Sequence, residues 1–144
     1  MKLSNKLEYA ILALLELAKR YHNDESLHIR GIAALQSIPI RYLEQILATL
    51  RNGGLIKSVR GSKGGYVLAR DPKKITVLDV LNCIEGVDAV PAADSTPQTV
   101  DNEVIEEVWE QANQAAYSVL QKCTLQDLCE QQASRQQMEN MYYI

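Results

Sequence analysis

The residues best suited to chemistry form a basic, glycine-rich run, RGSKGG, at positions 60–65. Arg60 and Lys63 can donate hydrogen bonds to phosphate, and the glycines allow backbone N–H groups to come close to a ligand. A nucleotide-binding loop would require a GxxxxGK[ST] or GxGxxG motif that opens a helix, and this stretch contains neither. The run therefore favours contact with a nucleic-acid backbone over the cradling of a single nucleotide.

A helix is predicted ahead of this run, beginning near residue 39. Pro39 suits its first position, and Gly53 and Gly54 stop it. Apolar residues recur at three- and four-residue spacing along one face: Leu43, Ile46, Leu47 and Leu50. The opposite face carries side chains that can form hydrogen bonds: Arg41, Tyr42, Gln45, Thr49 and Asn52. One face is thus predicted to meet the core and the other to meet a ligand.

Two short strands, residues 55–60 and 66–69, are predicted on either side of the glycine-rich connection at residues 61–65. We call this hairpin the wing. A helix with a polar outer face that is followed by a basic wing is the plan of a winged helix-turn-helix, in which the helix enters the major groove. By itself the helix is more typical of an ordinary amphipathic core helix, and the wing reverses that preference.

The charge is unevenly distributed along the chain. The net charge is −3, which is unusual for a nucleic-acid binder. However, residues 41–74 hold eight Lys or Arg against two Asp or Glu, whereas residues 75–144 hold two against twelve. Positive charge therefore gathers on the predicted helix and wing, where it could displace counterions from phosphates. The alternative is chance clustering of charges on a solvated surface.

Composition limits the class of protein. The 144 residues suffice for one domain and an extension. The longest apolar run, residues 9–18, is interrupted by Glu16 and is too short to cross a bilayer. Lys6 and Glu8 occupy the place where a signal peptide would need an apolar segment, so we expect a cytoplasmic protein. Three cysteines without a CxxC pair indicate no disulfide framework.

The remaining segments support a mainly α fold with a small β-hairpin wing. Ser4 can cap a first helix, a second is predicted from about Ile29 to Leu35, and Ser37-Ile38 is the predicted turn of the helix-turn-helix. Leu27 and its neighbours either add a short strand or lead straight into the second helix. A fourth helix is predicted to begin near Thr76. The predicted organisation is a DNA-binding domain at residues 1–86, a linker or sensing loop at 87–98 and a C-terminal part at 99–144.

A long helix is predicted after residue 99, followed by a last helix that a threonine, Thr124, can cap. The long helix follows a complete small domain and has little of its own chain to pack against. Its apolar stripe is therefore predicted to pair with a second copy of the chain, and the alternative is that it folds back onto the domain. The predicted dimerisation residues are Val100, Val104, Val108, Ala112, Ala115 and Val119.

Four stretches resemble the Rrf2 family of bacterial transcription regulators. They are MKLS, IPIRYLEQILATLRNGGLIKSVRGSKGGYVLAR, ITVLDVLNCIEG and TLQDL. The resemblance implies a homodimer that presents two winged helices to a roughly palindromic promoter site on double-stranded DNA. It implies that residues of the helix face the groove and that wing residues approach the minor groove and phosphates. The candidate DNA-binding residues are Arg41, Tyr42, Glu44, Gln45, Arg51, Arg60, Gly61, Ser62, Lys63, Gly64, Gly65 and Tyr66.

Glu44 has two possible roles. Its carboxylate could accept a hydrogen bond from a cytosine amino group and would be repelled by phosphate, so it would sharpen sequence specificity. Alternatively, it could form a surface ion pair with Arg41 or Lys57.

Many members of the family sense through an iron–sulfur cluster that three cysteines hold between the fourth helix and the long helix. Residues 87–102 contain no cysteine; Cys83 precedes them, and Cys123 and Cys129 come after the long helix. We therefore expect no cofactor and interpret the cysteines as structural, although a cluster with unusual ligands, Glu8 among them, is the alternative. Members without a cluster respond to a partner protein, a small metabolite or thiol oxidation.

The leading hypothesis is a DNA-binding repressor or dual regulator. The competing hypothesis is a winged-helix interaction module whose acidic C-terminal half docks a partner enzyme. An enzyme is not expected, because two histidines and scattered acids do not assemble a catalytic constellation.

Overall fold

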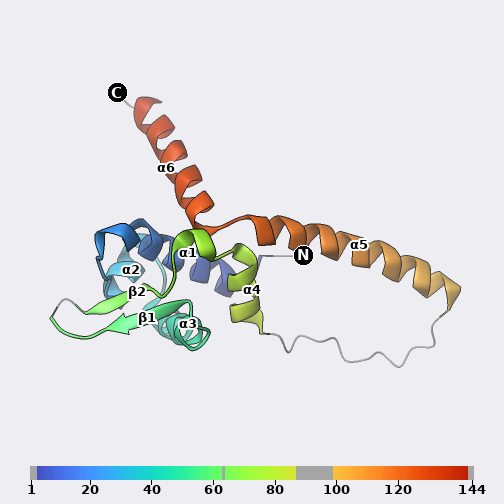
Figure 1. Ribbon diagram of the computed structural model, residues 1–144, viewed down its shortest axis with the longest axis horizontal. Coiled ribbons are helices and arrows are strands. Elements are labelled where there is room, and N and C mark those ends of the chain that lie inside the picture. The colour runs from blue at the N-terminus through green and yellow to red at the C-terminus, as the bar shows by residue number, and fades with distance from the viewer. Residues whose placement is uncertain (1–2, 63, 87–98, 143–144) are drawn as a thin grey trace.

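The computed structural model describes residues 3–62, 64–86 and 99–142. The helices within these ranges are α1 (Asn5–Lys19), α2 (Ile29–Gln36), α3 (Ile40–Asn52), α4 (Val77–Glu85), α5 (Val100–Lys122) and α6 (Leu125–Tyr142) (Figure 1). Two single 3-10 turns, Tyr21–Asn23 and Pro72–Lys74, connect elements. The wing is an antiparallel pair of strands, β1 (Ile56–Val59) and β2 (Gly65–Leu68). The predicted linker at residues 87–98 lies outside the described residues.

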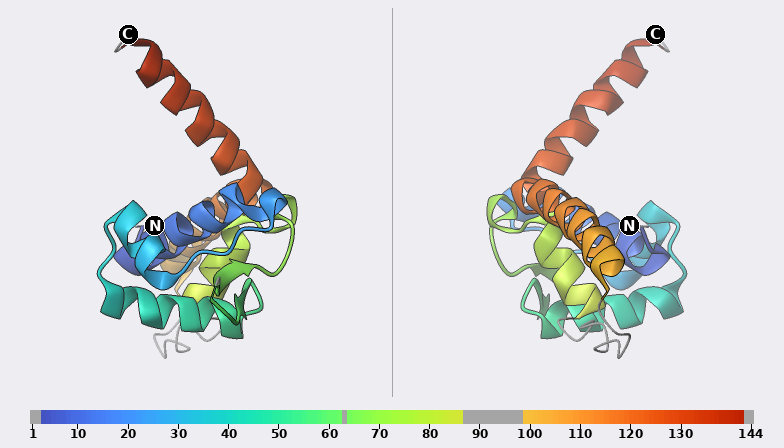
Figure 2. Two further views of the ribbon diagram at one scale, coloured as in Figure 1. Left: turned by 90° about the vertical axis from the view of Figure 1, so that its left-hand side faces the viewer. Right: turned by 90° about the vertical axis from the view of Figure 1, so that its right-hand side faces the viewer.

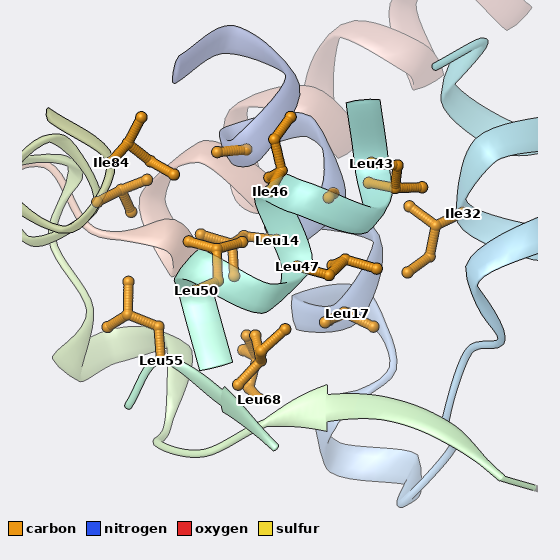
Figure 3. Close-up of a cluster of buried hydrophobic side chains, with 14 of the residues drawn as sticks. Leu14, Leu17, Ile32, Leu43, Ile46, Leu47, Leu50, Leu55, Leu68 and Ile84 are labelled. Atoms are coloured by element: carbon orange, nitrogen blue, oxygen red, sulfur yellow. The ribbon is translucent and has the colours of Figure 1, made fainter. Parts of the chain in front are cut away.

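The core lies where α1, α3 and α4 pack against one another. The predicted apolar stripe of α3 is confirmed, because all four of its members are fully buried. They meet Leu14 and Leu17 of α1 on one side, and Leu55 before β1 and Leu68 of β2 on another (Figure 3). Complete burial of each leucine stabilises the fold by about 1.5–3 kcal/mol. This packing fixes which face of α3 points away from the domain.

Capping side chains begin the helices largely as predicted. The Leu7 N–H donates to Ser4 Oγ at 3.1 Å, and Thr76 and Asp79 form a reciprocal capping box at the start of α4. Pro39 is an exception, because it is the residue before α3 and not its first helical residue. Its ψ of 130° is extended, and its carbonyl accepts from the Leu43 N–H at 3.0 Å.

The connection between α2 and α3 is the turn of a helix-turn-helix. Ser37 adopts the left-handed conformation, with φ 54°, which ends α2. The Ile38 N–H then donates to the Ala33 carbonyl at 3.1 Å, and the Ile38 side chain is buried. Upstream of α2, Leu27 forms an isolated β-bridge with Tyr66 of the wing, and α2 begins two residues later at Ile29. The segment therefore pairs with a strand and also leads straight into the second helix, the two alternatives that the sequence left open.

The C-terminal part joins the domain at the junction of α5 and α6. The Leu125 N–H donates to the Ile75 carbonyl at 2.9 Å, the Val77 N–H donates to the Cys123 carbonyl at 2.8 Å, and Leu125 is fully buried. Thr124 caps α6 as predicted, through a reciprocal pair of bonds with Asp127. Beyond this junction α6 projects from the side of the domain opposite α3 (Figure 2).

Helix α5 extends away from the domain and contacts it through α4 (Figure 1). None of its residues is buried. The alternative in which this helix folds back and buries its apolar stripe on the domain is therefore not what the structure shows. Among the described residues, no helix combines the length and the apolar character that crossing a membrane requires.

The end of α3 packs closely on α4. Cys83 Sγ of α4 lies 3.5 Å from the Thr49 carbonyl, and a β-carbon placed on Gly53 would overlap the same sulfur. Glycine at this position therefore allows the close approach of the two helices.

Replacing Gly53 with alanine is expected to destabilise the protein by about 1–3 kcal/mol, because the new methyl group over-packs the contact with Cys83. Urea unfolding measures the loss. Removing the sulfur makes room, so the double variant Gly53→Ala/Cys83→Ala should be more stable than the sum of the two single effects. Strictly additive losses would show that the overlap is not the cause.

Candidate nucleic-acid interface

The outward face of α3 presents polar side chains to solvent. Arg41, Glu44 and Gln45 are exposed, because they lie on the side of the helix opposite the four buried residues of the stripe. Sequence analysis assigned these three to one surface, and the structure places them together at the start of α3. A helix that exposes donors and an acceptor on one face can address the edges of base pairs.

Tyr42 lies at the border of this face and is 47% exposed. Its ring packs edge-on against Tyr9 of α1, with centroids 5.9 Å apart and an interplanar angle of 75°. Such contacts restrict the orientation of the ring. Tyr42 is thus positioned by α1 while part of its ring remains accessible.

The last turns of α3 are less available than the first. The Thr49 hydroxyl donates to the Gln45 carbonyl at 3.0 Å within the same helix. Arg51 is exposed, and its Nη1 lies 3.4 Å from Ser58 Oγ on β1. Arg51 therefore connects α3 to the wing in addition to adding positive charge between them.

The proposed surface ion pair of Glu44 is absent from the part of the chain that the structure describes, since neither Arg41 nor Lys57 comes within 4.0 Å of its carboxylate. The carboxylate is exposed at the start of α3. This arrangement favours the other role that the sequence suggested, an acceptor directed at a base.

The tip of the wing is exposed and held by backbone geometry. Arg60, Gly61 and Ser62 are exposed, whereas the predicted contact residue Lys63 lies outside the described residues. Gly61 has φ 113°, a conformation that favours glycine, and its carbonyl accepts from the Gly64 N–H at 2.9 Å. The turn directs the Arg60 end of the strand away from the core.

Gly65 and Tyr66 are less exposed than the tip of the wing. Both are half-buried, and Tyr66 exchanges two backbone hydrogen bonds with Leu27, at 2.8 and 3.0 Å. A β-carbon on Gly65 would overlap the Leu27 carbonyl and lie 2.8 Å from the His28 nitrogen. These two predicted contact residues fasten the wing to the segment that precedes α2.

Sequence reasoning missed two exposed apolar residues beside this surface. Ile40 is 43% exposed at the start of α3, and Val59 is 40% exposed on β1. An apolar side chain on a recognition helix can contact a thymine methyl group. Because Ile40 is adjacent to the buried stripe in the helical projection, its sequence pattern does not distinguish it from a core residue.

The three cysteines occupy three separate places. Cys83 faces the end of α3, Cys123 lies at the junction of α5 and α6, and Cys129 Sγ is 4.0 Å from the Leu15 carbonyl of α1. Burial raises the pKa of each thiol above its usual value, and the nearby Asp127 carboxylate raises that of Cys123 further. Each is therefore protonated at neutral pH.

These residues do not fit an iron–sulfur cluster, which binds thiolates gathered at one place. Within residues 3–62, 64–86 and 99–142, no group of three His, Cys, Asp or Glu residues is arranged to hold a metal ion. Glu8, the unusual oxygen ligand considered above, is exposed on α1.

Comparison with known proteins gives consistent results. The family model described as "Rrf2: Iron-dependent Transcriptional regulator" matches residues 3–131. The chain is 35% identical over 144 residues to the HTH-type transcriptional regulator CymR of Bacillus subtilis, and the alignment covers 100% of both chains.

Two solved structures are similar. That of CymR (YrzC), described as the global cysteine regulator of B. subtilis, gives a TM-score of 0.76 at 34% identity and covers 90% of this chain and 97% of that one. That of T. potens IscR gives a TM-score of 0.77 at 34% identity, with coverage of 91% and 88%.

Proposed function

The chain belongs to the Rrf2 family of transcriptional regulators, and we propose that it is a sequence-specific repressor that binds a roughly palindromic promoter site as a homodimer. Like its relatives, it is a DNA-binding transcription regulator; it is not an enzyme. The fold is a winged helix-turn-helix, and it matches the structures of those relatives.

One observation carries this proposal: α3 exposes Arg41, Glu44 and Gln45 on one surface with the basic wing beside it. In this arrangement α3 lies in the major groove and the wing lies along the adjacent backbone. The net charge of +6 over residues 41–74 supplies the attraction to phosphate, while the acidic C-terminal part lies elsewhere.

Different side chains have different roles in this proposal. Gln45 has an amide that can pair with adenine, and Glu44 can accept from the amino group of cytosine. Arg60 at the exposed tip of the wing contacts phosphate and carries no sequence information. Specificity thus comes from α3 and a large share of the affinity from the wing.

The helix α5 supports the homodimer. Six of its apolar side chains are 57–74% exposed: Val100, Val104, Ile105, Val108, Trp109 and Val119. Contiguous apolar surface of this kind marks a protein interface. Two copies that pair through α5 would present two α3 helices to two half-sites, as a palindromic operator requires.

Gln45→Ala is expected to change the preferred base at one position of each half-site, because one base contact is worth about 1–3 kcal/mol. Arg60→Ala is expected to weaken binding to every duplex alike and to lower the slope of affinity against salt by about 1. Fluorescence anisotropy with a duplex selected from a random library, its single-base variants and several salt concentrations measures both effects.

Arg135→Ala provides the control for Arg60→Ala. Arg135 is also an exposed arginine, but it lies on α6. Its replacement should leave affinity and salt dependence unchanged. If wild type and all variants bind every duplex equally well, the protein is not a sequence-specific regulator.

We propose further that the protein works without a resident iron–sulfur cluster, although the family description names iron, because its three cysteines lie at three separate places. Its signal would then come from a partner protein or a small molecule. Protein purified without oxygen should lack visible charge-transfer bands, iron and acid-labile sulfide and still bind its operator. Stoichiometric iron and sulfide would contradict this proposal.

A further inference from the structure

A carboxylate is buried between the elements that carry the DNA-binding surface. Glu16 of α1 is 5% exposed, and it is the one charged residue that the described part of the chain buries. Its neighbours along α1, Leu14, Leu17 and Ala18, are also buried. A charge in such a place is retained only with full hydrogen bonding.

Three side chains from two elements bond to Glu16. Gln36 Nε2 donates to Oε1 at 2.6 Å, Lys19 Nζ to the same oxygen at 3.1 Å, and Arg20 Nη1 to Oε2 at 2.8 Å. Burial alone would raise the pKa of Glu16, but the bonds from Arg20, Lys19 and Gln36 together hold that pKa below its usual value. The carboxylate is therefore ionised at neutral pH.

The bond to Gln36 reaches the helix-turn-helix directly. Gln36 is the last residue of α2, and Ser37 with its left-handed backbone follows it. Ile38 then leads into α3. A contact that fixes the Gln36 side chain consequently fixes the point at which the chain turns towards the recognition helix.

The bond to Arg20 fixes a residue that lines a groove beside the wing. Arg20 also donates to the Glu16 carbonyl at 2.9 Å, so its guanidinium is held at two points. The same residue lines a groove of about 540 Å³ that Val67 and Leu68 of β2 also line. Glu16 thus joins the end of α1 to the turn before α3, and its partner Arg20 shares a groove with the wing.

We propose that Glu16 is a positioning residue for DNA recognition, which holds the end of α2, and through it α3, in a fixed orientation relative to α1 and the wing. This inference rests on the proposed function. The stability that a buried ionic group supplies is often small, because desolvation offsets the attraction. Its geometric effect is different, since base contacts require side chains held within about 0.5 Å of the productive position.

A pair of substitutions tests the contact. Gln36→Glu places a second carboxylate against Glu16 and should lower affinity for the selected operator about tenfold, while affinity for an unrelated duplex falls much less. Glu16→Gln alone loses the charge that Arg20 and Lys19 contact. The double variant Glu16→Gln/Gln36→Glu can form the same hydrogen bond with donor and acceptor exchanged, and it keeps the net charge of the wild type.

The quantity to compare is the ratio of the affinity for the operator to the affinity for an unrelated duplex. In the double variant this ratio is expected to recover to within about threefold of its wild-type value. General repulsion from DNA weakens binding to the operator and to the unrelated duplex alike, so it cancels in this ratio and cannot explain such a recovery. If the single variants do not fold, Gln36→Met, which removes the bond without adding a charge, should still lower that ratio with little change in melting temperature.

Two failures are distinguishable. Wild-type protein that does not prefer the operator overturns the proposed function. Wild-type protein that does prefer it, with an unchanged ratio in Gln36→Glu and Gln36→Met, overturns the role of Glu16 alone. A double variant that is no better than the worse single variant also overturns it.

Discussion

Alanine in place of Gly65 is expected to detach the wing from the segment before α2 and to weaken operator binding at least tenfold, which corresponds to about 1.4 kcal/mol. The new β-carbon would overlap the Leu27 carbonyl and lie 2.8 Å from the His28 nitrogen. Both neighbours are backbone atoms, so no side-chain rotation can relieve the overlap. The wing must move instead.

That movement breaks a small but specific set of contacts. The Tyr66 N–H and carbonyl both bond to Leu27, and β2 has β1 as its other partner in the sheet. A two-stranded hairpin without further support is marginally stable in water. Once the bridge is lost, the wing that carries Arg60 is no longer held in one position, and the contact of Arg60 with phosphate carries an added entropic cost.

Gly31→Ala is the matched control. A β-carbon on Gly31 would lie 3.5 Å from the Leu27 side chain, an ordinary contact, and Gly31 lies within α2. Alanine there should stabilise the helix slightly, by up to about 1 kcal/mol, and leave DNA binding intact. Anisotropy titrations and thermal unfolding of both variants make the comparison. Unchanged operator affinity in Gly65→Ala would show that the bridge to Leu27 does not position the wing.

The contrast between these glycines shows what the sequence could predict. The buried stripe of α3, its stop at Gly53 and the cap at Ser4 follow from spacing and residue type over a few positions, which are local signals. The close contact of Gly65 joins residues 38 positions apart. No local pattern contains that information, so sequence reasoning listed Gly65 and Tyr66 among the DNA-contacting residues of the wing and did not detect their contact with Leu27.

Glu16 and α5 illustrate the same limit. In the sequence Glu16 is only an interruption of an apolar run, because its partner Gln36 lies 20 residues away. On α5 the predicted stripe omitted Ile105 and Trp109, which lie beyond its edge in the helical projection. Both are more than 60% exposed, because the domain covers so little of α5 that apolar residues outside the stripe also remain uncovered.

Arginine in place of Val108 is expected to convert the proposed homodimer into a monomer. Val108 is 59% exposed in the middle of the apolar stripe of α5. Pairing of two α5 helices would bury an unpaired guanidinium at this position in each chain, at a cost of several kcal/mol. Arginine is a good helix former, so α5 itself should persist. Sedimentation equilibrium should give the mass of one chain, 16.1 kDa, in place of two.

The effect on DNA should be larger than that of any single contact. Two linked half-site contacts bind about 10²- to 10⁴-fold more tightly than one, so the Val108→Arg variant should lose operator affinity by about that factor. The new positive charge would by itself favour DNA, so electrostatics cannot produce the loss. Affinity for a duplex with a single half-site should remain near that of one wild-type domain.

Gln121→Arg separates loss of the interface from a general effect of charge on α5. Gln121 is exposed on the same helix but lies outside the apolar stripe. The Gln121→Arg variant should remain dimeric and keep its operator affinity. If Val108→Arg is also dimeric and binds the operator normally, α5 does not form the interface. A monomeric Val108→Arg with full operator affinity would instead show that one winged helix suffices, because the contacts of α3 and the wing alone would then account for binding.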